Sequence, residues 1–169
     1  MTPPRLAAIA VSLALTAGLG ACGGSDKDKN TKVTTDTSGS GEKTDGTAVS
    51  LKGAMSGAEE VPGPGVKDGV GTFRFDLTGT KGCYDLKATL GEKPVKAHIH
   101  QGAKGVSGPV VVDLKPTFEP GESAFTAKAC VDLPAETATE LIADPAGYYV
   151  NVHSEGHPDG AMRGQLAKF

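Results

Sequence analysis

Apolar and polar residues alternate with a period of two along much of the chain after residue 70, and this pattern is typical of strands with one buried face. In the segment 71–77, Phe73, Phe75 and Leu77 would share one face, while Arg74 and Asp76 would share the other. Glycine (24) and proline (11) are plentiful and supply turns between such segments. Further strands are expected at 83–90, 108–114, 125–133, 148–153 and 161–166. The pattern predicts an all-β fold, an antiparallel β-sandwich or barrel.

One short helix is expected in a connection between strands. The segment 134–145 begins with Pro134, carries Glu136 in its first turn and stops before Pro145. Proline at the first position, an acidic residue in the first turn and a proline at the end are helix boundary signals.

The first residues have the layout of a bacterial export signal. Arg5 supplies a positive charge, and the apolar run 6–21 is shorter than the ~20 residues that span a bilayer. The run leads into L-G-A-C at 19–22, which resembles the lipobox of bacterial lipoproteins, whose cysteine becomes the lipidated first residue. We therefore expect a signal peptide at 1–21 and a lipid anchor at Cys22, on the extracytoplasmic face of the cell membrane. The alternative is an ordinary secretory signal in which Cys22 is incidental.

The segment 22–47 after this cysteine is expected to be a disordered polar tether, and 48–169 a single domain. Between 23 and 46 there is one valine and no other large apolar side chain, so the segment cannot bury enough surface to offset its ordering entropy. Removing the signal deletes one arginine and no acid, which changes the formal charge from -3 to -4. This mild charge and the lack of a basic patch in the sequence argue against a nucleic-acid partner.

The two cysteines of the domain make an even pair once Cys22 carries lipid. Alternation places Cys83 and Cys130 on the outward faces of two predicted strands. Since exported proteins keep disulfides, we predict a Cys83–Cys130 bond that joins these strands. Two free thiols are the alternative.

All four histidines fall into two short motifs, A-H-I-H and N-V-H-S-E-G-H. Because Ala97 and Ile99 take the core face, His98 and His100 must point to the opposite face of their strand. By the same alternation, His153 points away from the core face of its own strand. If the two strands are neighbours, the three imidazoles form one cluster.

Further residues are predicted around this cluster. His157 follows in a turn as a fourth candidate ligand, and Asn151 and Arg163 share the outer face as supporting residues. Imidazoles without a thiolate favour copper, with zinc as the second choice. The alternative is a polar surface network in which the histidines bind no metal.

The motifs around the histidines resemble those of the CHRD (chordin-type) domain. The resemblance rests on A-H-I-H-Q-G-A-K-G-V-S-G-P-V-V-V-D-L and G-Y-Y-V-N-V-H-S-E-G-H-P-D-G-A-M-R-G-Q-L, together with G-A-E-E-V-P and G-V-G-T-F-R-F-D-L nearer the start, and spans about residues 50–169. It implies an immunoglobulin-like or superoxide-dismutase-like β-sandwich and no settled activity.

A weaker similarity is to copper–zinc superoxide dismutase, which also has an H-x-H strand, a later V-H strand and an arginine near copper. The matching residues are His98, His100, His153 and Arg163. The bridging histidine and zinc site of those enzymes are not recognisable here, so the similarity implies a single copper at most, with Arg163 beside it to stabilise a small anion.

Three functions therefore compete. The first is a membrane-tethered metal-binding module, and the second is a non-catalytic structural or adhesion module. The third is a superoxide-dismutase-like redox enzyme, which is the least favoured, because the sequence offers no defensible Ser-His-Asp spacing, phosphate loop or carboxylate pair. The sequence identifies no protein partner.

Overall fold

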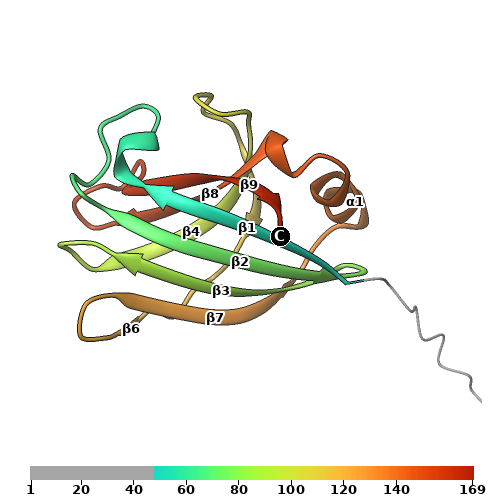
Figure 1. Ribbon diagram of the computed structural model, residues 1–169, viewed down its shortest axis with the longest axis horizontal. Coiled ribbons are helices and arrows are strands. Elements are labelled where there is room, and N and C mark those ends of the chain that lie inside the picture. The colour runs from blue at the N-terminus through green and yellow to red at the C-terminus, as the bar shows by residue number, and fades with distance from the viewer. Residues whose placement is uncertain (1–47) are drawn as a thin grey trace, which may run out of the picture. The chain divides into compact units, whose positions relative to one another are not determined.

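The computed structural model describes residues 48–169, and these form an antiparallel sheet that curls around one core. The strand order is β5-β4-β8-β9-β1-β2-β3-β7-β6, and every neighbouring pair is antiparallel. Figure 1 shows β1, β2, β3 and β7 as one layer, with β4 and β8 behind it. The strands are β1 Val49–Ser56, β2 Val70–Thr78, β3 Lys81–Thr89, β4 Pro94–Gln101, β5 Val110–Asp113, β6 Glu119–Pro120, β7 Phe125–Asp132, β8 Tyr148–Ser154 and β9 Met162–Lys168. The all-β prediction is confirmed.

The core lies on the concave side of this curled sheet, where both layers contribute side chains. Phe73, Phe75 and Leu77 of β2 are fully or almost fully buried, as their alternation predicts. Ile99 of β4 and Val150 of β8 are completely buried in the same cluster. Burial of these apolar side chains is the main stabilising term of such a domain.

β7 follows the predicted alternation in direction but is less buried than the central strands. Alternation in the predicted strand 125–133 puts Phe125, Ala127, Ala129 and Val131 on the inward face. The register agrees, since Ala127 faces Leu86 and Ala129 faces Tyr84, but only Ala127 is buried and Ala129 is exposed. β7 is flanked on its outer side by the two-residue strand β6 alone. The core therefore thins out toward this edge of the sheet.

The predicted helix is present as α1 (Ala135–Ala143), and a 3₁₀ turn η2 (Pro145–Gly147) follows it. A second 3₁₀ turn, η1 (Gly57–Glu59), follows β1. Ala138 and Leu141 of α1 are buried against the core. Within residues 48–169, no helix has both the length and the apolar character needed to cross a bilayer.

The predicted disulfide is also present. Cys83 of β3 and Cys130 of β7 are bonded, and they face each other directly in the register of the two strands. The bond lies on the convex face, opposite the core, as the alternation of both strands requires.

The expectations for the N-terminal part concern residues that the structure does not describe. The signal peptide at 1–21, lipidation of Cys22 and the tether at 22–47 all lie outside the described residues.

Candidate metal centre

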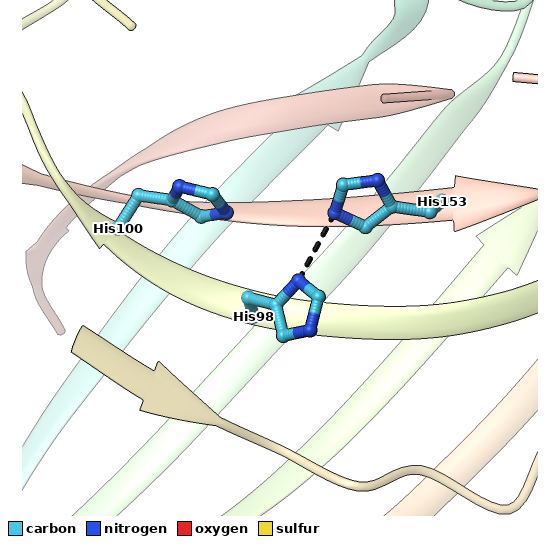
Figure 2. A group of neighbouring side chains, drawn as sticks. All are labelled: His98, His100 and His153. Atoms are coloured by element: carbon cyan, nitrogen blue, oxygen red, sulfur yellow. Dashed lines mark hydrogen bonds between the residues drawn. The ribbon is translucent and has the colours of Figure 1, made fainter. Parts of the chain in front are cut away.

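Two neighbouring strands bring three of the four histidines together. His98 and His100 lie on β4, and His153 lies on β8, which pairs with β4. Figure 2 shows the three rings converging from these strands. A ring nitrogen of each histidine lies within 4.8 Å of a ring nitrogen of the other two.

This spacing is close to that of a metal site. Metal–nitrogen bonds of ~2 Å in a tetrahedral arrangement place the nitrogens about 3.3 Å apart. Nδ1 of His98 and Nε2 of His153 are 3.0 Å apart, and the rings of His98 and His100 lie edge to face at 5.8 Å. A small movement of His100 would bring all three nitrogens onto one ion.

In two of the three rings, the second nitrogen binds a backbone carbonyl oxygen. His100 Nδ1 is 2.9 Å from the carbonyl oxygen of Gly108, and His153 Nδ1 is 2.9 Å from that of Pro158. A carbonyl oxygen only accepts, so both nitrogens carry the hydrogen. Nε2 of each neutral ring is then a bare lone pair, and both lone pairs belong to the cluster. Such outer hydrogen bonds are typical of metal-ligating histidines.

His98 is held differently. Because His153 Nε2 is an acceptor, the hydrogen between the two rings belongs to His98 Nδ1. Nε2 of His98 is 3.8 Å from Asp113 Oδ1 across the β4–β5 pair. Binding a metal through Nδ1 requires this hydrogen to move to Nε2, where the Asp113 carboxylate can accept it.

Burial keeps the cluster neutral. It lowers the pKa of His98, His100 and His153 below the usual value, and mutual proximity lowers that of His98 further. Neutral imidazole is the form that ligates metals. The cluster is therefore ready to coordinate near neutral pH.

The outer face of β8 is covered rather than solvated, which the alternative of a polar surface network did not anticipate. Every residue of β8 is buried, including Tyr149 and Asn151, whose side chains point away from the core. Loops 102–109, 57–66 and 155–161 lie over this face and bond to it. Alternation identifies which face a side chain occupies, but it does not reveal that loops close over that face.

Arg163 lies under these loops and is only 2% exposed. Its guanidinium carbon lies 4.2 Å from the centroid of the Tyr149 ring. The His100 ring stacks on the same Tyr149 ring, with 4.9 Å between the two centroids. Nη1 donates to the carbonyl oxygen of Val106 at 3.1 Å. The predicted supporting arginine is thus one aromatic ring away from a candidate ligand, and its charge helps to lower the pKa of His100.

Asn151, the other predicted supporting residue, binds a carboxylate that sequence reasoning missed. Its Nδ2 donates to Glu60 Oε1 at 2.9 Å. Glu60 is 4% exposed, and burial raises its pKa. No local signal marks Glu60, since it lies 91 residues from Asn151 and reads as an ordinary acidic loop residue.

The fourth predicted ligand, His157, does not join the cluster. Its Nδ1 lies 2.5 Å from Glu92 Oε1, and Ser154 Oγ donates to the same oxygen at 2.6 Å. The turn that follows β8 carries His157 toward Glu92 and away from the centre. We therefore correct the ligand set to His98, His100 and His153.

Four buried polar atoms near β8 have no hydrogen-bond partner among the described residues: His100 Nε2, Arg163 Nη2, Asn151 Oδ1 and Glu60 Oε2. Buried polar groups are normally satisfied, and an orphaned group calls for a bound water, ion or ligand. The orphaned His100 nitrogen is the lone pair that would complete the three-nitrogen set.

Comparisons with known proteins give one match. The model of the CHRD domain family matches residues 51–166, nearly all of the described chain. No curated protein and no solved structure matches.

Proposed function

Because the chain belongs to the CHRD domain family, which carries no settled activity, we propose from the site itself that the protein is a membrane-tethered, extracytoplasmic module that binds one transition-metal ion, copper in first place. The ligands are His98 Nδ1, His100 Nε2 and His153 Nε2. We propose that the protein binds the metal ion, and we propose no reaction at the metal.

One observation carries the proposal. Carbonyl oxygens behind His100 and His153 fix the inner Nε2 of each ring as an acceptor. His153 Nε2 accepts from His98 Nδ1, and His100 Nε2 has no partner among the described residues. Buried acceptors are normally satisfied, and a metal ion bound between the three rings would satisfy this one. The set holds no thiolate and no carboxylate, which favours copper, then zinc, over calcium or magnesium.

A structural role for the histidines is the second candidate. The His98–His153 contact is already a hydrogen bond without a metal, and the rings link β4, β8 and two loops. On this account the three histidines stabilise the fold, and their replacement lowers stability whether or not copper is present.

A copper titration separates the two candidates. The unlipidated chain is titrated with Cu(II) against a competing chelator of known affinity, and the alanine variants of His98, His100 and His153 are compared with His157→Ala. We expect one tight copper per chain, at least 100-fold weaker binding in each of the three variants and unchanged binding in His157→Ala. Equal affinity in all four variants, or no stoichiometric binding at micromolar copper, would sink the proposal.

The tether is tested separately. The expected lipidation of Cys22 and the disulfide together support an extracytoplasmic location. We expect wild type in the membrane fraction of a bacterial host and Cys22→Ser in the soluble fraction or medium. A Cys22→Ser variant that stays in the membrane would contradict lipid anchoring.

A further inference from the structure

The convex face of β1, β2, β3 and β7 carries a groove of about 510 Å³ with a cationic rim. The register places Lys52 opposite Arg74, Arg74 opposite Asp85, and Asp85 opposite Lys128, so the four side chains form one row across four strands. Lys87 borders the groove from β3. These residues are scattered in the sequence, and only the sheet register assembles them.

Two of the cations, Lys52 and Lys87, form no ion pair with the residues that the structure describes. Arg74 is bound to Asp76 at 2.9 Å and Lys128 to Asp85 at 2.6 Å. For Lys52 and Lys87, no carboxylate within residues 48–169 comes closer than the 4.0 Å of an ion pair. The domain as a whole has twelve Lys and Arg against fifteen Asp and Glu, so the groove is a cationic surface on an acidic domain.

An exposed aromatic ring completes the groove. Phe169 is 71% exposed, and its ring centroid lies 5.2 Å from Lys52 Nζ and 4.9 Å from Arg74 Cζ. An apolar ring beside lysines suits the boundary between headgroups and acyl chains, where apolar groups insert and cations meet phosphates.

The first strand of the described chain, β1, lies beneath this groove. β1 begins at Val49, and Ser50 and Lys52 point to the convex side. In the sequence, 25 residues separate Cys22 from Ala48. A lipid at Cys22 would therefore hold the domain within reach of the bilayer.

We infer that this groove binds the anionic phospholipid headgroups of the membrane to which the chain is tethered. The inference rests on the lipid anchor of the proposed function and is independent of the metal. The histidine centre lies on the outer face of β4 and β8, on the other side of the core, so docking through the groove turns the metal centre away from the bilayer.

Vesicle binding tests the inference. The unlipidated chain from Gly23 onward is used, since the core and the disulfide lie wholly in residues 48–169. It is sedimented with vesicles of equal parts phosphatidylglycerol and phosphatidylcholine, and with pure phosphatidylcholine. We expect binding to the anionic vesicles alone, and its loss in 0.5 M salt. Lys52→Glu/Lys87→Glu should bind about 30-fold more weakly, since each lysine near an anionic surface contributes roughly fivefold.

A matched variant controls for net charge. Lys67 and Lys93 are exposed and lie outside the groove, so Lys67→Glu/Lys93→Glu should bind nearly as wild type. Equal loss in both double variants, or equal binding to neutral vesicles, overturns the inference. Binding to soluble poly(glycerol phosphate) as tight as to vesicles overturns it in favour of a polyanion ligand. Copper affinity should not change in either double variant. A negative vesicle result would therefore leave the proposed metal centre untouched, and a negative copper result would leave the vesicle result untouched.

Discussion

At the scale of single residues, two of the three imidazoles of the centre are oriented by a carbonyl oxygen that their second nitrogen binds. The Gly108 and Pro158 carbonyls fix the tautomers of His100 and His153, and His98 is left with a hydrogen that must move before it can ligate. No net proton is released when that hydrogen passes from Nδ1 to Nε2. Metal uptake should therefore depend little on pH while the rings are neutral.

Stability without metal should depend on pH through the same three rings. Their pKa values are lowered in the folded state, so between these values and about 6.5 the unfolded chain binds more protons than the folded one. The free energy of unfolding then rises with pH through this window. Above about pH 6.5 the contribution of the three rings is complete and no longer changes with pH. Glu60, whose pKa is raised, contributes the opposite slope above pH 4.5.

Denaturant unfolding of the metal-free chain at pH 5.5 and 7.5 checks this prediction. It is best done in Glu60→Gln, which removes the opposing slope. We expect higher stability at pH 7.5, and a smaller difference once His100 is replaced by asparagine. A stability that rises on acidification would show that the rings are protonated in the fold.

At the scale of elements, the loop over β8 controls the centre from outside the ligand set. A Cβ on Gly108 would lie 1.7 Å from the Gln101 carbonyl oxygen, so an alanine there must displace the carbonyl that orients His100. We predict that Gly108→Ala weakens copper binding about 10- to 100-fold, the usual effect of losing an outer partner of a ligand.

Gly91→Ala provides the control for this substitution, because a Cβ there meets nothing within 4 Å. Both variants are measured by the same chelator competition. Unchanged affinity in Gly108→Ala would mean that the loop does not orient the ligand.

The Cys83–Cys130 bond acts on a different element pair. It closes a separation of 47 residues between β3 and β7, and a loop of that size predicts about 4 kcal/mol of stabilisation from the unfolded chain. We expect Cys83→Ser/Cys130→Ser to lose roughly this amount in guanidinium unfolding, with copper affinity retained. Loss of copper binding in a variant that is still folded would link the bond to the centre, contrary to our account.

The same elements show which structural features the sequence pattern could predict and which it could not. Alternation places Phe75 and His100 on the correct faces because each strand has a strict period of two. It could not predict the burial of Arg163 or the Asn151–Glu60 bond, because loops distant in sequence create both. His157 was misassigned for a related reason: a turn has no period, so the direction of its side chain depends on its partner, Glu92.

At the scale of the whole molecule, the curled sheet separates two surfaces of different chemistry. The outer face of β4 and β8 holds neutral imidazoles under loops, while the convex face of β1, β2 and β3 exposes cations and Phe169. The core lies between them. Under the two proposals together, a lipid-tethered chain would dock on the membrane through one face and present a metal through the other.

The ligand count of the copper complex tests the central claim most directly. Electron spin-echo and electron paramagnetic resonance spectra of a one-to-one Cu(II) complex report how many imidazoles bind the ion. We predict three in the wild type and in His157→Ala, and two in His100→Gln. A complex with fewer than three imidazoles, or a spectrum that His100→Gln leaves unchanged, would contradict a centre built from His98, His100 and His153.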